Sequence, residues 1–180
     1  MSRIIALLRA INVGGTGKVA IADLRKLVTD LGFADVASYI ASGNLVFTGD
    51  GREPGELEAL FQAEAGRRLG LNSDWILRTP ADWRAMIEAS PYPDFAAEHP
   101  SRYLVTVFKT APDPARLDEV RAMATLGEDL TLIGDALHIC FPEGAGKSKL
   151  AGAVIEKRLG ARGTARNWNT VLKLADMAGV

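Results

Sequence analysis

Apolar side chains in the first half of the chain recur in the order strand, helix, strand, strand, helix, strand. Apolar residues at every or every second position indicate strands, and apolar residues three and four positions apart indicate helices. The predicted elements are a strand at 3–9, a helix at 21–31, strands at 36–41 and 45–48, a helix at 54–69 and a strand at 74–78. The first strand has apolar residues on both faces, so we expect both of its faces to be covered. Ser42 to Asn44 favours a hairpin turn, because Gly and Asn tolerate positive φ.

The second half of the chain repeats this order of elements. The predicted elements are a strand at 103–109, a helix at 114–123 capped by Asp113, strands at 130–133 and 136–141, a helix at 149–159, a strand at 164–168 and a closing helix at 170–178. Gly134 and Asp135 favour a hairpin turn between the two middle strands. The two halves share no obvious sequence identity, so the repeat is inferred from the pattern alone.

These patterns predict an α/β (α+β) protein, a tandem duplication of ferredoxin-like βαββαβ units with antiparallel or mixed sheets and helices packed on them. We expect an N-terminal half at 1–79, a linking helix and proline-rich connection at 80–100, and a C-terminal half at 101–180. The linking helix has Thr79 as its N-cap and Pro80 at its first position. The proline-bearing segment at 90–100 is the best candidate boundary. Two such sheets can join edge to edge, pack face to face or form separate lobes, and the pattern does not choose among these.

The composition predicts a globular protein of the cytoplasm. Of the 180 residues, 48% are hydrophobic and 24% are charged, which is ordinary for a folded domain. Cys140 is the single cysteine, so no intrachain disulfide forms, in keeping with a reducing compartment. The first apolar run is too short to cross a bilayer, so no membrane partner is expected.

Charge is distributed unevenly along the chain. The net charge of −1 argues against a general nucleic-acid binder. Residues 144–180 nevertheless carry seven Lys and Arg against two acids, for a net +5, while the remaining 14 basic and 20 acidic residues give −6. Such asymmetry indicates either an interaction face or a solvated face balanced by acids elsewhere.

Two glycine-bearing segments connect a strand to a helix and are candidates for anion binding. The segment INVGGTGKV, at 11–19, places backbone amides where a ligand can approach, but it matches neither a Walker A loop nor a GxGxxG fingerprint. The segment EGAGKSK, at 143–149, also fails as a Walker A loop because Phe141 occupies the place of the first glycine. It still offers the candidate anion ligands Lys147, Ser148 and Lys149. The alternatives are a plain connection in the first case and a helix cap from Ser148 in the second.

The segment TARNWNT, at 164–170, is the third candidate. Asn167 or Asn169 is expected to cap the last helix. Trp168 is either a core residue or a stacking platform for a base, with Arg166 on the phosphate. No cluster of aromatic residues of the kind used by sheet-based RNA readers is present in the sequence.

The sequence contains no standard catalytic or metal-binding constellation. His99 and His138 lack the spacing of metal ligands, and Cys140 reads as a core thiol beside a packed His138. No metal and no cofactor are therefore expected, and whether the protein is an enzyme is left open.

Three long motifs resemble a known family. ALLRAINVGGTGKV, DLRKLVTDLGFADVASYIASGNLVF and GKSKL…IEKRLG…TARNWNTVLKLADMA resemble the bacterial family called domain of unknown function 1697, from about Ala6 to the C-terminus. The resemblance implies a duplicated ferredoxin-like arrangement and no particular activity. This chain departs from the family at Ala10, where glycine is usual, and at Thr16, where lysine is frequent. The motif positions are Arg9, Asn12, Gly14, Gly15, Lys18, Ser42, Gly43, Asn44, Lys147, Ser148, Lys149, Arg166, Asn167, Trp168 and Asn169.

The leading expectation is a binding module for a phosphate-bearing ligand, either a nucleotide or a short nucleic acid. Its expected ligand-binding residues are Lys147, Ser148, Lys149, Arg166, Asn167, Trp168 and Asn169, with Arg9 and Lys18 contributing if the loops converge. The alternatives are a small enzyme acting on a phosphorylated or acidic metabolite, and a protein-interaction or oligomerisation domain.

Overall fold

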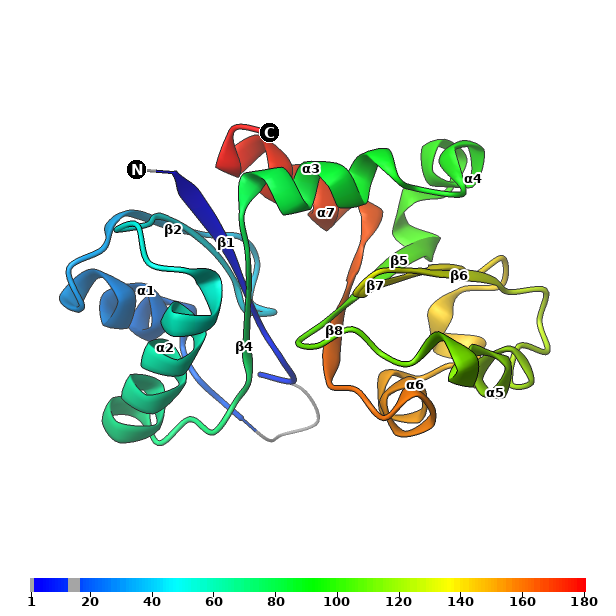
Figure 1. The fold of residues 1–180 in the computed structure, drawn as a ribbon, viewed down its shortest axis with the longest axis horizontal. Helices are drawn as coiled ribbons and strands as arrows, with labels where there is room; N and C mark the ends of the chain where they lie inside the picture. Colours follow the sequence, from blue (N-terminus) through cyan, green and yellow to red (C-terminus); the bar gives the residue numbers. More distant parts are fainter. Residues whose placement is uncertain (1, 13–16) are drawn as a thin grey trace. The chain divides into compact units, whose positions relative to one another are not determined.

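Two four-stranded antiparallel sheets, one in each half of the chain, form the framework of the described residues (Figure 1). The computed structural model describes residues 2–12 and 17–180. These residues fall into two units, the first made of Met1–Ala85 with Lys173–Val180 and the second of Met86–Leu172. The predicted division at 1–79, 80–100 and 101–180 stays a prediction.

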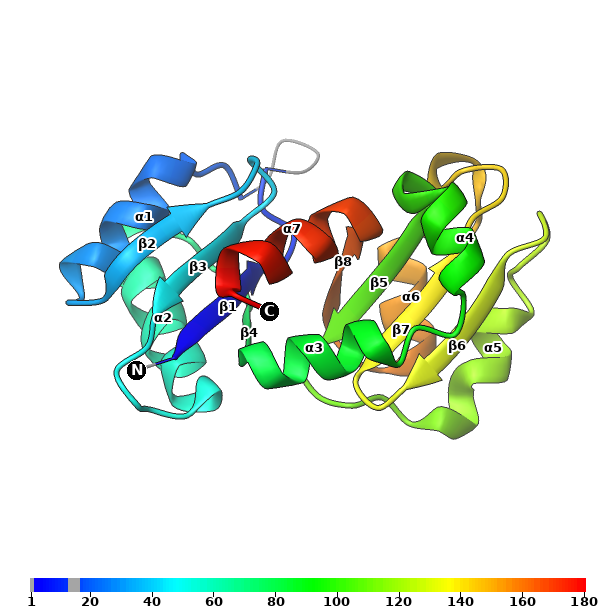
Figure 2. The ribbon, with the colours of Figure 1, turned by 90° about the horizontal axis from the view of Figure 1, so that it is seen from above.

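The first unit has the ferredoxin-like order of elements. Its strands and helices are β1 (Arg3–Leu8), α1 (Ile21–Asp30), β2 (Ala34–Ser38), β3 (Asn44–Thr48), α2 (Pro54–Leu69) and β4 (Trp75–Arg78). The strand order is β2-β3-β1-β4, and every neighbouring pair is antiparallel. α1 and α2 cover one face of this sheet (Figures 1 and 2).

The core of the first unit lies between that face and the two helices. Ile4, Ala6 and Leu8 of β1 point into it, and the rings of Phe33 and Phe61 pack edge to face with centroids 5.1 Å apart. The alternate β1 residues, Ile5 and Leu7, are also fully buried, which confirms that both faces of this strand are covered. Burial on both sides explains the unbroken apolar run at the start of the sequence.

The second unit repeats the same topology. Its strands and helices are β5 (Tyr103–Phe108), α5 (Leu117–Arg121), β6 (Asp129–Ile133), β7 (Ala136–Cys140), α6 (Gly152–Leu159) and β8 (Gly163–Asn167). The strand order β6-β7-β5-β8 corresponds to that of the first sheet, which confirms the predicted fold class. α5 and α6 cover one face, while α4 (Pro93–Glu98) lies over the other (Figures 1 and 2).

Five further elements, two helices and three short turns, complete the described secondary structure. They are the helices α3 (Pro80–Glu88) and α7 (Trp168–Ala178), and short 3₁₀ turns at Pro100–Arg102, Pro114–Arg116 and Ala145–Lys147. The N-terminal cap predicted for α3 is confirmed, since the Thr79 hydroxyl accepts from the Asp82 N–H at 3.1 Å. None of the described helices is long and apolar enough to cross a membrane.

Several predicted boundaries are wrong for local reasons. The strand predicted at 36–41 ends at Ser38, because Ile40 adopts a left-handed φ of 50° that a strand cannot continue through. The helix predicted from residue 149 begins at Gly152, and the closing helix predicted from 170 begins at Trp168. The proline-rich segment at 90–100 contains α4, whose first residue is Pro93; proline is tolerated there because the first helical N–H needs no partner.

Candidate functional site

The register of the second sheet brings two of the predicted polar segments to one end of that sheet. Tyr103 at the start of β5 faces Cys140 at the end of β7, and Leu104 faces Asn167 at the end of β8. Residues 141–149 therefore leave the sheet at the same end as residues 167–169. We call this end, with the 3₁₀ turn at Pro100–Arg102, the loop end of the second unit.

Lys147 and Lys149 lie on the surface of the loop end. The Lys147 side chain is 72% exposed, and its Nζ is 3.8 Å from a carboxylate oxygen of Glu143, which is itself exposed. Lys149 is exposed. Exposed pairs such as Lys147 with Glu143 contribute little to stability, so both ammonium groups remain available to an anion.

Ser148 is engaged within the protein. Its hydroxyl donates to a carboxylate oxygen of Glu128 and accepts from the Leu150 N–H at 3.1 Å. Burial alone would raise the pKa of Glu128, but the bonds from Ser148 and from the Leu126 N–H outweigh it and lower that pKa. Ser148 does not cap α6, which begins four residues later. Its place is to hold the loop at 143–149 against the segment before β6.

Arg166 and Asn167 also serve the protein's own backbone. Arg166 is only 7% exposed, and its Nη1 donates to the Thr164 hydroxyl at 2.7 Å and to the Ala165 carbonyl at 2.8 Å. Burial lowers the pKa of this guanidinium to about 10. The Asn167 Oδ1 accepts from the Thr170 N–H at 3.0 Å, which confirms that one of the two asparagines caps the closing helix.

Trp168 and Asn169 line an open pocket of about 420 Å³. Trp168 is 8% exposed and stacks on the Tyr103 ring, with centroids 4.8 Å apart and planes 22° from parallel. The rest of the lining is mainly apolar and comes from the end of α3, from α4 and from α7, and includes Ser90 and Leu172. Every described residue that lines this pocket belongs to the second unit.

A buried chain of hydrogen bonds runs behind this pocket. The Ser90 hydroxyl is 2.8 Å from the Tyr103 hydroxyl, which is 2.6 Å from Nδ1 of His138. Burial lowers the pKa of His138 to about 4 and raises the pKa of Tyr103 to about 12, the latter against a smaller opposing effect of the Ser90 hydrogen bond. Cys140 is buried in the same region, and burial raises the pKa of its thiol to about 12, as befits a core thiol.

Sequence reasoning missed Ser90 and Tyr103. Ser90 lies in the segment interpreted as a boundary, and Tyr103 was seen only as the first residue of a strand. The available signal was the alternation that puts Tyr103 and Val105 on one face of β5, since Val105 pairs with His138. That signal can be used only once the strand register is known.

Hydrogen bonds from the Asn12 side chain hold the described part of the glycine-bearing segment of the first unit in place. The Asn12 carboxamide donates to the carbonyls of Val19 and Ala41 and accepts from the Val19 N–H, each at 3.0 Å. Gly43 lies beside it with φ +83°, and a Cβ there would come within 2.7 Å of the Ile11 side chain. Gly14, Gly15 and Thr16 lie outside the described residues. The described part of this motif therefore has a clear structural purpose.

Arg9 and Lys18 belong to the first unit. The Arg9 guanidinium is 3.8 Å from an Asp74 carboxylate oxygen and 29% exposed. Lys18 is exposed and, with Asn12, lines a hollow of about 410 Å³. Convergence of these cations with Lys147 stays a prediction.

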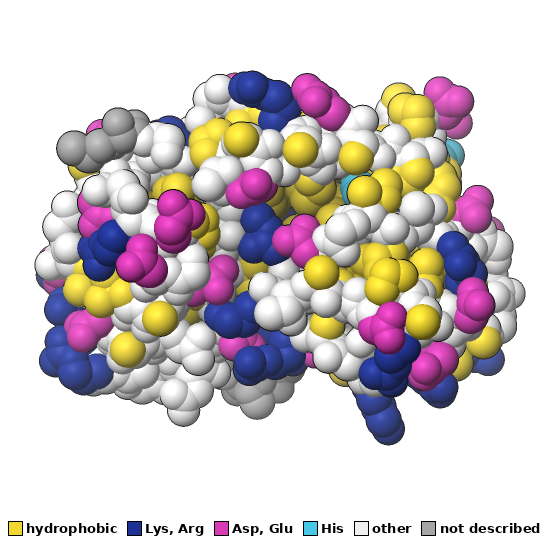
Figure 3. All heavy atoms as spheres, in the orientation of Figure 1, with side chains coloured by type: hydrophobic (Ala, Val, Ile, Leu, Met, Phe, Trp, Pro, Cys, Tyr) yellow, Lys and Arg dark blue, Asp and Glu magenta, His cyan; other side chains and the backbone are white. Residues whose placement is uncertain are grey.

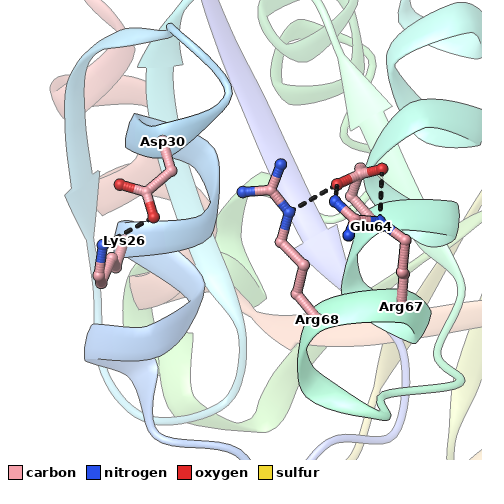
Figure 4. Close-up of polar contacts among 5 residues, drawn as sticks. All are labelled: Lys26, Asp30, Glu64, Arg67 and Arg68. Atoms are coloured by element: carbon pink, nitrogen blue, oxygen red, sulfur yellow. Dashed lines mark hydrogen bonds and ion pairs between the residues drawn. The ribbon is translucent and has the colours of Figure 1, made fainter.

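Charges elsewhere on the surface are mostly mixed in sign. On the face shown in Figure 3, Lys and Arg alternate with Asp and Glu and do not form one broad basic stripe. Figure 4 shows the same pattern on the helices of the first unit, where Lys26 pairs with Asp30 at 2.7 Å and Glu64 pairs with Arg67 and Arg68 at 2.6 Å. Among the described residues, no group of three or more His, Cys, Asp and Glu side chains is placed to hold a metal ion.

Comparison with known proteins supports the fold described above. The chain is similar to the solved structure of the conserved bacterial protein SP0830 from Streptococcus pneumoniae, with 27% identity, 98% of each chain covered and a TM-score of 0.76. No curated protein matches it significantly. The model of the family described as Protein of unknown function (DUF1697) matches residues 1–138, so the resemblance is confirmed there, while the GKSKL and TARNWNT motifs lie beyond the match. The chain therefore belongs to the DUF1697 family.

Proposed function

We propose that the second unit binds a phosphate-bearing small molecule of the nucleotide class at its loop end. The observation that carries this proposal is the sheet register, which brings the pocket lined by Trp168 and Asn169 to the same end as the basic loop at 143–149. A pocket of about 420 Å³ is within the range that small-molecule ligands occupy.

The proposed phosphate contacts are Lys147 and Lys149, with Arg102 added from the structure. Arg102 is exposed, and its Nη1 donates to the Pro142 carbonyl at 2.8 Å, which holds the guanidinium beside the start of the loop. Ser148 and Arg166 are engaged within the protein, so the proposal assigns them no direct contact with the ligand.

A nucleotide fits these observations better than a short nucleic acid. Sheet-based readers of single strands stack bases on aromatic residues of an open sheet face. Here Tyr103, the aromatic residue of β5 that contacts Ser90 and Trp168, is completely buried. A pocket at the same end of the sheet as two or three cations supports a ligand with one ring system and one phosphate group.

Calorimetric titration of the full chain with UMP and ADP, at low and moderate salt, tests the proposal. The double variant Lys147→Ala, Lys149→Ala should bind about twofold to thirtyfold more weakly, because two exposed charge pairs contribute about 0.2–1 kcal/mol each. The salt dependence of its affinity should also be shallower.

The matched control is the double variant Lys157→Ala, Arg158→Ala, which removes two exposed cations from α6. It lowers the net charge by the same amount away from the loop at 143–149. Equal affinities in the two double variants would contradict the proposed phosphate contacts, and no binding of either nucleotide to the wild-type chain would refute the function.

A further inference from the structure

The hydrogen-bond chain behind the pocket ends in an unsatisfied atom. His138 is 0% exposed, and its Nε2 has no hydrogen-bond partner among the described residues, although Nδ1 is bonded to Tyr103. At the other end of this hydrogen-bond chain, Ser90 lines the pocket, and its hydroxyl has Tyr103 as a hydrogen-bond partner. A buried polar atom without a partner requires an explanation.

Two proton arrangements satisfy the observed distances. If the neutral imidazole carries its proton on Nε2, Tyr103 donates to Nδ1, Ser90 donates to Tyr103, and Ser90 offers the pocket only lone pairs. If the proton is on Nδ1, His138 donates to Tyr103, Tyr103 donates to Ser90, and the Ser90 proton is free to point into the pocket. The position of one proton on His138 thus decides whether the pocket presents an acceptor or a donor.

Burial favours the second arrangement. With the proton on Nε2, the structure would bury an N–H donor that has no acceptor, and orphaned buried N–H groups are rarer than under-satisfied acceptors. With the proton on Nδ1, Nε2 carries only a lone pair, Tyr103 donates to Ser90, and the Ser90 proton is left for an acceptor in the pocket that Ser90 lines. Successive donors also polarise one another in a low-dielectric interior, which strengthens the outermost donor.

We propose that His138 carries its proton on Nδ1, that Ser90 therefore donates a hydrogen bond into the pocket, and that the pocket takes a nucleobase that offers Ser90 an acceptor atom. This inference rests on the proposed nucleotide function and names the ligand's ring. The exposed Asn169 carboxamide at the same pocket can accept from an N–H of the base that adjoins this acceptor atom. Uracil and hypoxanthine offer a carbonyl oxygen beside an N–H, and adenine offers a ring nitrogen beside an amine, so all three satisfy this pair of contacts. His138 and Tyr103 act through Ser90 and are positioning residues.

The proton position can be measured without a ligand. Nitrogen-15 NMR distinguishes protonated from bare ring nitrogens, and the variant His99→Gln leaves His138 as the only histidine. His99 is a suitable position to change because its side chain is 47% exposed. We expect a protonated Nδ1 and a bare Nε2 in the native protein at pH 7. A protonated Nε2 with a bare Nδ1 would overturn the proposal.

The contribution of the base to affinity is measured by titrating the full chain with UMP, IMP and AMP, which carry a base, and with ribose 5-phosphate, which does not. UMP, IMP and AMP should bind more tightly than ribose 5-phosphate, and Ser90→Ala should weaken UMP about fivefold to tenfold, the range expected for one lost hydrogen bond to a ligand acceptor. Ser90→Ala should leave ribose 5-phosphate unchanged, because that ligand has no base. The control Ser101→Ala, an exposed serine of the neighbouring 3₁₀ turn, should leave all four ligands unchanged.

Tyr103→Phe breaks the hydrogen-bond chain and keeps the aromatic ring, so it should weaken UMP without weakening ribose 5-phosphate. Unchanged UMP binding in Ser90→Ala, or equal affinities for UMP and ribose 5-phosphate in the wild type, would overturn this inference. If Lys147→Ala, Lys149→Ala still weakens ribose 5-phosphate in that case, the proposed function stands alone. Absence of binding by every probe refutes both.

Discussion

Acid should destabilise this protein through His138. The imidazole is fully buried, and burial lowers its pKa from 6.5 to about 4. In the unfolded chain the same group titrates near pH 6.5, so between these two values the unfolded state binds a proton that the native state does not. The contribution of His138 to stability is therefore fully present above pH 6.5 and decreases as the pH falls towards 4. The perturbation to test is a change from pH 7 to pH 5 in the wild type and in His138→Leu.

The expected size follows from proton linkage. With pKa values of 6.5 unfolded and about 4 folded, the free energy of unfolding should fall by about 2 kcal/mol from pH 7 to pH 5. For a chain of this length, that loss corresponds to roughly 4–8 °C in Tm. The charged groups nearest in sequence and register are Asp129, on the strand beside β7, and Arg166, on the far side of β5. Burial is the cause resolved for the shift at His138, so neither charge changes its direction.

The assay is urea unfolding at pH 7 and pH 5, followed by tryptophan fluorescence. His138→Leu removes the titrating group and keeps the side chain apolar, so it should lose most of the pH dependence, whatever its stability at pH 7. Carboxylates with lowered pKa values, such as Glu64 and Glu128, are present in both proteins and cancel in the comparison. An equal loss of stability in both proteins between pH 7 and pH 5 would show that His138 is not a buried neutral imidazole.

Three further changes test the structural reading. Ala10 has a left-handed φ of 53°, so Ala10→Gly should raise the free energy of unfolding, measured in urea, by about 0.5–1 kcal/mol. The control Ala63→Gly, at an exposed position of α2, should lower it by about 1 kcal/mol. Equal effects of the two substitutions would disprove the strain at Ala10. Glu58→Ala should cost about 1–3 kcal/mol in the same assay, since the buried Glu58 carboxylate accepts from the Leu77 N–H at 2.8 Å, and a loss no larger than that of Glu58→Gln would argue against this role. Asp113→Ala should cost about 1 kcal/mol by removing the cap on the Ala115 N–H, while an unchanged urea midpoint would mean that the cap is not formed.

The order of helices and strands was predictable because each of them shows the hydrophobic periodicity of its own type. The helix at 54–69 has the same bounds in the structure as in the prediction, with a proline at its start and Gly70 in the left-handed conformation after its end. The strand at 34–38 was not predictable to the residue. Asp35, within this strand, and Ile40, two residues beyond its end, adopt positive φ. The pairing of β2 with β3 also shifts register between Ala34 and Ala37. These features depend on the neighbouring strand and leave no periodic signal.

The candidate site was predictable only in part. The residues contributed by one continuous segment, such as Lys147 to Lys149, stood out through composition. The chain from Ser90 through Tyr103 to His138 spans 13 and then 35 positions of sequence, and each link requires a face, a register and a helix position to be correct at once. Sequence periodicity supplies the face, but the register came from the structure.

The family motif divides into residues that the fold needs and residues that it does not. Asn12 and Gly43 join two loops of the first unit, and Ala10, at a position where the family usually has glycine, has the positive φ that glycine adopts without strain. These positions are explained by folding alone. Lys149 and Asn169 are exposed, and no hydrogen bond to either side chain is found among the described residues. Residues with no structural role are the ones whose removal can change binding without changing stability, so the loop end of the second unit is where the function of this chain is best sought.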